Sequence, residues 1–329
     1  MTDPTQRRFC PTPIWLIYGL LVVEGLLWLS EQYGWFNEKK GWTVLIAVAV
    51  VGVAMLLMLL WFLASLLFRS RFQFSIRSLL VLTVAIAVPC RWMAVEIKAA
   101  REQTAAFAPV KQMGGWVAYD WECEANGDYL LNHLQARDPA PTWLRDLMGD
   151  AFFGSPKWVT LDGGHVTDAG LAHIEGLSEI LTLSLYDTPI TDAGLAHLEG
   201  LDQLHSLLLG ATHVTDAGLA HLERLSQLRQ LSLDSTQVTG SGLPHLAGLH
   251  QLQTLMLNVT KVTDTGLAHL AGLRQLQRLW LNKTQVTDAG LAHLTGLSQL
   301  KELHLGGTKV TDAGVKKLQR ALPSCGVYR

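Results

Sequence analysis

Apolar and polar positions repeat with a constant step through the second half of the chain, the step that leads from Val214 to Val238. The segment VTDAGLAHL at 214–222 recurs, with small changes, at 166–174, 190–198, 238–246, 262–270, 286–294 and 310–318. No insertion or deletion interrupts this step. A fixed period of this size is typical of a solenoid, in which stacked coils share one continuous core and the ends need caps.

Each repeat contains a helical pattern and then a strand pattern. In the repeat that begins at Val214, apolar residues follow helical spacing at Leu219, Leu222 and Leu225. We expect Thr215 or Asp216 to cap this helix, because a short side-chain oxygen accepts the unpaired N–H groups of a first turn. The run Leu228-x-x-Leu231-x-Leu233 predicts a strand. Seven such strands are predicted, centred on Leu161, Leu185, Leu209, Leu233, Leu257, Leu281 and Leu305.

The strand pattern LxxLxLxx, followed by a polar residue, resembles the leucine-rich repeat. The resemblance implies an α/β solenoid, with a curved parallel sheet and helices on its convex side. Many leucine-rich repeats carry Asn at the polar position, and we expect a Thr hydroxyl there to bond the neighbouring coil. These residues are Thr188, Thr212, Thr236, Thr260, Thr284 and Thr308.

The first hundred residues contain three apolar runs, at 14–29, 42–68 and 79–88. As a helix, 42–68 is about 40 Å long and exceeds the ~30 Å hydrocarbon core of a bilayer, so it predicts a transmembrane helix. The run 14–29 predicts a second transmembrane helix, which contains the carboxylate of Glu24, and no role is assigned to this residue. Whether 79–88 also spans the bilayer is left open. The chain as a whole resembles uncharacterised bacterial membrane-anchored leucine-rich repeat proteins.

The predicted domains are a membrane anchor at 1–95 with two to three transmembrane helices, a juxtamembrane helix and cap at 96–157, and the repeat domain with its C-terminal cap at 158–329. Within 96–157, residues 114–123 predict a strand and 142–148 a helix with Thr142 as its cap. The aromatic residues Phe152, Phe153 and Trp158 are expected to close the solenoid core.

Lys and Arg in short loops predict the orientation of the anchor. Arg7, Arg8 and the basic connector at 69–77 favour the cytoplasm. With three spans, the repeat domain then lies outside the cytoplasm of a multi-pass inner-membrane protein. If 79–88 does not cross, the repeat domain is cytoplasmic.

Charge and motifs exclude several function classes. The formal net charge is −2, and no basic stripe follows the repeats, which argues against a nucleic-acid partner. The four cysteines show no metal spacing and predict unpaired thiols. A column of histidines, from His173 to His293, is interpreted as independent surface residues, and a column of aspartates, from Asp168 to Asp312, as helix caps. No catalytic motif appears, so no enzyme activity, cofactor, metal or small-molecule substrate is predicted.

The strand face carries the candidate site. Leu231 and Leu233 point inward, so the residue between them faces outward. Exposed Trp and Met beside Arg and Asn are typical of a protein interface. The predicted protein-binding residues are Tyr186, Leu208, Asp234, Met256, Asn258, Arg278, Trp280, Asn282 and His304.

These patterns predict a non-catalytic binding or scaffolding module held at the lipid bilayer. One alternative is a membrane sensor that signals through a separate effector. Another is an adaptor in protein turnover, because the T-D-x-G-L element resembles the repeats of F-box adaptors. No F-box segment is found upstream of the repeats.

Overall fold

The computed structural model describes residues 94–122, 140–163 and 165–329, together with Ala87 and Arg91. The predicted spans 14–29 and 42–68 lie outside these residues, and Ala87 is the one described residue of 79–88. Within the described part of the chain, no helix is both long and apolar enough to cross a bilayer. The chain divides into two compact units, one of Met1–Glu102 with Asp138–Gly154 and one of Gln103–Arg137 with Ser155–Arg329.

The first unit, here called the small unit, has its own apolar core. Residues 94–102 of this unit are helical, and the helix α5 spans Thr142–Met148, as predicted. The N-cap of α5 is Pro141, however, and Thr142 makes no capping bond. Phe153 lies in this core and Phe152 packs against it, so this is not the solenoid core that the two residues were predicted to close. The core residues are Ala140, Leu144, Met148 and Phe153, with Ile97 and Phe152 packed against them.

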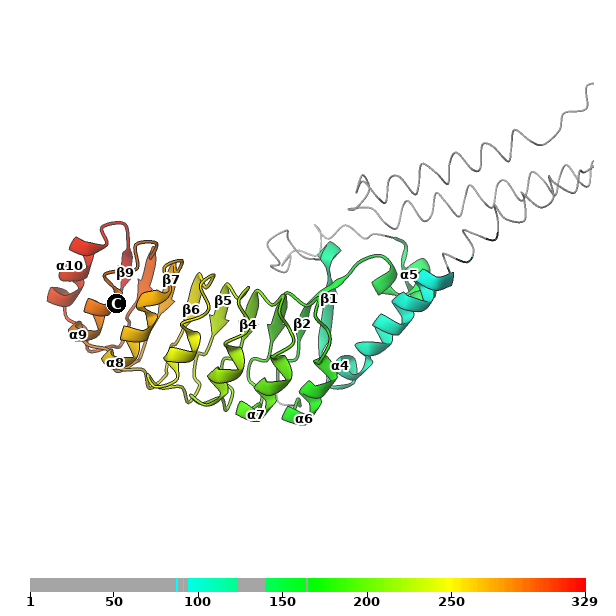
Figure 1. Ribbon diagram of the computed structural model, residues 1–329, viewed down its shortest axis with the longest axis horizontal. Helices are drawn as coiled ribbons and strands as arrows, with labels where there is room; N and C mark the ends of the chain where they lie inside the picture. The colour runs from blue at the N-terminus through cyan, green and yellow to red at the C-terminus, as the bar shows by residue number, and fades with distance from the viewer. Residues whose placement is uncertain (1–86, 88–90, 92–93, 123–139, 164) are drawn as a thin grey trace, which may run out of the picture. The chain divides into compact units, whose positions relative to one another are not determined.

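The second unit is a solenoid with a nine-stranded sheet whose strands follow chain order (Figure 1). Strand β1 pairs antiparallel to β2, and every later pair is parallel, with each residue beside its equivalent in the next repeat. Seven repeat strands, β2–β8, match the predicted number, but each ends one residue before its predicted centre. The strands are β1 Trp116–Tyr119, β2 Pro156–Thr160, β3 Thr182–Ser184, β4 Ser206–Leu208, β5 Gln230–Ser232, β6 Thr254–Met256, β7 Arg278–Trp280, β8 Glu302–His304 and β9 Gly326–Tyr328.

Short helices cover the convex side of the sheet (Figure 1). In the repeat with Gly240 and Pro244 the helix begins only at Leu243, because the Asp of the other repeats is missing and Pro244 occupies the first turn. The convex helices are α6 Asp168–Leu171, η4 Ala172–Ile174, α7 Asp192–Leu195, η5 Ala196–Leu198, η6 Gly218–Leu222, η7 Leu243–Leu246, α8 Asp264–Leu267, η8 Ala268–Gly272, α9 Asp288–Leu291, η9 Ala292–Leu294 and α10 Asp312–Ala321.

The solenoid core consists of columns of leucine between sheet and helices. In the repeat that begins at Val214, Leu219, Leu222 and Leu231 have no exposed surface, and the other repeats follow the same pattern. At the N-terminal end, helix α4 (Ala108–Gln112) buries Val110 next to β1. A Cβ on Gly115 would lie 2.6 Å from the Leu161 side chain, so this close approach requires glycine.

A tight turn after each strand places one residue per repeat in the left-handed region of backbone conformation. The column runs Gly163, Asp187, Ala211, Ser235, Val259, Lys283 and Gly307, with φ between 56° and 85°. Its N–H groups donate across the coils, as from Val259 to the carbonyl of Asn282 at 2.8 Å. A β-branched residue is strained in this region, because its side chain crowds the backbone.

Val259→Asn is therefore expected to raise the free energy of unfolding by about 0.5–2 kcal/mol, since Asn tolerates the left-handed region. Val259 is 50% exposed, so little buried surface is lost. Chemical denaturation of the variant and the wild type measures the effect. Ala211 occupies the equivalent turn of another coil and is not β-branched. Ala211→Asn is therefore the matched control and should gain less stability. A lower stability for Val259→Asn contradicts the strain argument.

Candidate functional site

The candidate site is the concave face of the sheet, which the convex helices leave uncovered (Figure 1). Its central column is the last residue of each repeat strand. Ser184 and Ser232 in this column are buried, whereas Leu208, Met256, Trp280 and His304 are partly exposed. Met256, Trp280 and His304 therefore gather on consecutive strands toward the C-terminal end, whereas Leu208 lies on β4.

Three rings lie side by side on the last three strands. Trp280, His304 and Tyr328 occupy register positions on β7, β8 and β9. The centroids of Trp280 and His304 are 5.4 Å apart in an edge-to-face arrangement, and those of His304 and Tyr328 are 4.6 Å apart in a stack. These three residues are called the ring stack below. Such ring pairs hold large apolar side chains in fixed positions on a surface.

Tyr328 was missed by the sequence analysis. The C-terminal segment was interpreted as a cap, but it adds the strand β9, and 54% of the Tyr328 surface is exposed. The signal was present, because Tyr328 follows His304 at the same step by which His304 follows Trp280.

The indole nitrogen of Trp280 is buried and has no hydrogen-bond partner among the described residues. An unpaired buried N–H costs about 1–3 kcal/mol and calls for an explanation. Met256 and His304 occupy the register positions on either side of Trp280. The Trp280 ring therefore meets His304 edge-to-face while its N–H is without a partner among the described residues.

Asp234, Asn258 and Asn282 connect neighbouring coils. Asp234 Oδ1 accepts from the Asn258 N–H at 2.7 Å, and Asn258 Oδ1 accepts from the Asn282 N–H at 2.9 Å. Asn282 Oδ1 accepts from the Gly306 N–H at 2.6 Å. Burial raises the pKa of Asp234, and its hydrogen bonds oppose that rise. One side-chain oxygen of each of these three predicted site residues therefore has a structural role.

The other predicted residues form two groups. Arg278, on β7, donates through Nε to the Thr254 hydroxyl at 3.1 Å and lies on the strand that carries Trp280. Tyr186 and Leu208 belong to the region of β3 and β4, which lies roughly 14–19 Å from β7 at ~4.8 Å per strand. The Tyr186 ring lies over Gly210, where a Cβ would come within 2.9 Å of it. The structure thus separates Tyr186 and Leu208 from the ring stack.

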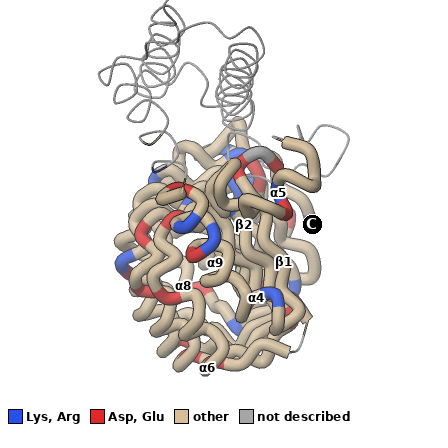
Figure 2. The backbone as a smooth tube through the Cα atoms, turned by 90° about the vertical axis from the view of Figure 1, so that its right-hand side faces the viewer, with Lys and Arg blue, Asp and Glu red and all other residues tan. Residues whose placement is uncertain are grey.

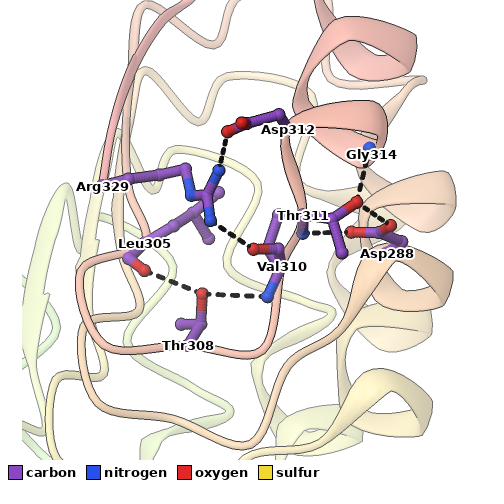
Figure 3. Close-up of polar contacts among 8 residues, drawn as sticks. All are labelled: Asp288, Leu305, Thr308, Val310, Thr311, Asp312, Gly314 and Arg329. Carbon is purple, nitrogen blue, oxygen red and sulfur yellow. Dashed lines mark hydrogen bonds and ion pairs between the residues drawn. The ribbon is translucent and has the colours of Figure 1, made fainter.

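The Thr column bonds within its own coil, so the prediction of a bond to the neighbouring coil was wrong. Each hydroxyl donates to the Leu carbonyl three residues earlier, as from Thr236 to Leu233 at 2.7 Å and from Thr308 to Leu305 at 2.7 Å (Figure 3). The distance is set by the tight turn between the two residues, which brings the hydroxyl back to its own strand.

The Asp column does not cap its own helices, contrary to the prediction. Threonine is the N-cap of the convex α-helices, as at Thr191 and Thr311. In the repeat that begins at Val214 the N-cap is Ala217, so neither Thr215 nor Asp216 holds the predicted position there. The Asp carboxylate instead accepts from the Thr of the next coil, and Asp288 accepts from the Thr311 N–H at 2.7 Å and the Thr311 hydroxyl at 2.6 Å (Figure 3). Asp312, in the last coil, pairs with Arg329.

Three histidines of the convex column are not independent, so the prediction of independent surface residues was wrong for them. His197, His221 and His245 each bond through Nδ1 to a glutamate of the preceding coil, with His221 and Glu199 2.7 Å apart. The hydrogen bond from His221 lowers the pKa of Glu199. The later repeats carry Ala247 and Ala271 at the glutamate position, which ends the series.

Metal ligands do not cluster in the described part of the chain, where no group of three or more His, Cys, Asp or Glu side chains is placed to hold an ion. Cys325 is free and buried, and burial raises the pKa of its thiol. Lys and Arg residues are interspersed with Asp and Glu along the coils (Figure 2).

A coil of constant length, with a short parallel strand in the LxL pattern and a helix opposite it, is the geometry of a leucine-rich repeat. The second unit therefore has a fold like that of leucine-rich repeat solenoids. No protein-family model matches the chain. No curated protein matches it either.

Several solved structures are similar to this chain. An internalin, InlF, of Listeria monocytogenes is 25% identical over 52% of this chain and 47% of its own, with a TM-score of 0.45. Internalin C2 of the same organism is 27% identical over 52% and 80%, with a TM-score of 0.40. A leucine-rich repeat protein of Leptospira interrogans is 18% identical over 48% and 51%, with a TM-score of 0.36. The match spans about half the length of InlF and of the Leptospira protein.

Proposed function

We propose that this protein is a non-catalytic protein-binding module, tethered to a membrane, whose leucine-rich repeat domain binds its partner on the concave face. The observation that carries the proposal is the ring stack of Trp280, His304 and Tyr328, with Met256 beside it and Arg278 on the same strand. Tyr, Trp, Met and Arg are enriched at protein interfaces, where a few such residues supply most of the binding energy.

The size and charge of the face support a protein partner. From β2 to β9 the sheet crosses seven strand spacings, or about 34 Å at ~4.8 Å each. This width suits a standard protein interface of ~800 Å² on each partner. Acidic and basic residues are interspersed along the coils that Figure 2 shows, and the formal net charge of −2 does not favour a nucleic-acid backbone.

The tether is proposed from the length and apolar character of 42–68 and 14–29. Together with 79–88 they would form a multi-pass anchor in a bacterial inner membrane, with the repeat domain outside the cytoplasm. Two spans instead of three would place the domain on the cytoplasmic side.

Photo-crosslinking of the full chain in its membrane tests the binding face. A benzophenone amino acid at position 328 is expected to capture a protein that the same label at Lys316, an exposed residue of α10, does not capture. With that protein purified, Tyr328→Ser and Trp280→Ala should each weaken binding at least about tenfold, as for residues at the centre of an interface. Lys316→Ala should leave the affinity unchanged. Equal capture at both positions, or full affinity in both ring variants, contradicts the proposal.

A further inference from the structure

The small unit exposes two large apolar side chains on one face of α5. Trp143 is 62% exposed and Leu147 is 57% exposed. They are four residues apart and therefore lie on the same side of the helix. Leu144 and Met148, the next residue in each case, are buried in the core of the small unit. The described residues of the small unit thus leave the Trp143–Leu147 face uncovered.

This face is connected to the segment that precedes residue 94. Ile97 packs against the core to which α5 contributes, and the Arg101 guanidinium donates to the Leu147 carbonyl at 2.8 Å. Ile97 comes nine residues after Val88, the end of the apolar run 79–88. Nine residues span about 14 Å as a helix and at most about 32 Å when extended. The exposed face of α5 is therefore fastened close to the end of the predicted anchor.

We infer that the Trp143–Leu147 face docks into the headgroup region of the lipid bilayer that holds the anchor, an inference that rests on the proposed membrane tether. Tryptophan is enriched at this depth, because its ring is apolar while its N–H remains within reach of polar partners. A short helix with one apolar face lies in the plane of the interface with that face buried about 5–10 Å deep.

The charge of the small unit indicates which lipids suffice. Its described residues carry four basic and four acidic side chains, for a net charge of zero: Arg91, Lys98, Arg101 and Arg145 against Glu96, Glu102, Asp146 and Asp150. Two pairs lie close together, Lys98 with Glu102 at 3.8 Å and Arg145 with Asp150 at 3.5 Å. Apolar insertion therefore drives the docking, and anionic lipid is not required.

Fluorescence quenching in the full chain tests the inference. The protein, with its native cysteines replaced by serine, is reconstituted into phosphatidylcholine nanodiscs and labelled with NBD (nitrobenzoxadiazole) at Trp143→Cys or at Leu147→Cys. Lipids with a nitroxide near the headgroup should quench both labels several-fold more strongly than a label at Tyr186→Cys, which is similarly exposed in the solenoid. The difference should persist at high salt.

The outcomes separate this inference from the proposed tether. If the chain enters the discs but the labels at 143 and 147 emit as in water, the docking is wrong and the tether stands. A blue-shifted but unquenched label means that another protein segment or a second copy covers the face, which also contradicts the docking. If the chain does not enter the discs at all, the tether fails and the docking fails with it.

Discussion

Leu281→Ala is expected to lower the free energy of unfolding by about 2–5 kcal/mol, the range for a buried leucine that leaves a cavity. Leu281 has no exposed surface and lies between the buried Leu257 and Leu305 of the adjacent coils. Its N–H donates to the His304 carbonyl at 2.8 Å, so the backbone around the cavity is held in place and cannot collapse freely. Thermal and chemical denaturation, with hydrogen exchange along the chain, measure the loss.

Leu208→Ala is the matched control, because the same atoms are removed from a partly exposed side chain on the concave face. Its effect should be clearly smaller. In a repeat protein each coil contacts only its neighbours, so Leu281→Ala should reduce exchange protection in β7, β8 and β9 more than in β3. Equal losses for the two variants contradict the assignment of Leu281 to the core.

The periodic part of the fold could be predicted because every repeat tests the others. The constant step predicted the seven repeat strands and the convex helices. Every repeat also carries a glycine at the position of Gly218, in a column that runs from Gly170 to Gly314. At Gly218 a Cβ would lie 2.4 Å from the Asp192 carboxylate, which explains that column. The non-repeating segments offered no such check, and Phe152 and Phe153 were accordingly placed in the wrong core.

The direction of side-chain bonds could not be predicted, because spacing alone does not say which coil a polar group faces. The same motif, Thr followed by Asp, is compatible with a helix cap in one coil or with a bridge between two. The structure uses Thr311 for the cap and Asp288 for the bridge. For the candidate site, spacing found Met256, Trp280 and His304, but the cap interpretation of the last residues concealed Tyr328.

Asp216→Ala is expected to cost about 2–4 kcal/mol, because it removes several hydrogen bonds to a charged acceptor and leaves their donors unpaired. Asp216 accepts from the Thr239 N–H at 2.7 Å, from the Thr239 hydroxyl at 2.5 Å and from the Ser241 hydroxyl at 2.5 Å. These bonds join two coils on the convex side. Chemical denaturation near neutral pH measures the cost.

The pH dependence of this difference gives a second measurement. Burial raises the pKa of Asp216, but the hydrogen bonds from Ser241, Thr239 and Gly242 together outweigh burial, and the net pKa is lowered. A carboxyl group with a lowered folded pKa stabilises the fold fully above its unfolded value of about 4 and loses this contribution as the pH falls through the folded pKa. The stability of the wild type should therefore approach that of Asp216→Ala in acid.

The chain supplies its own control one coil later, where Gly240 replaces the Asp. Thr263 then has no carboxylate partner among the described residues, and its hydroxyl lies 3.0 Å from that of Thr265. Thr239→Val should consequently lose much more stability than Thr263→Val, although both remove one hydroxyl from the same position of the repeat. Equal losses would show that the hydroxyl acts only within its own turn. A loss confined to Thr239→Val assigns the stabilisation to the bridge from Asp216, because the described residues give Thr263 no such bridge to the preceding coil.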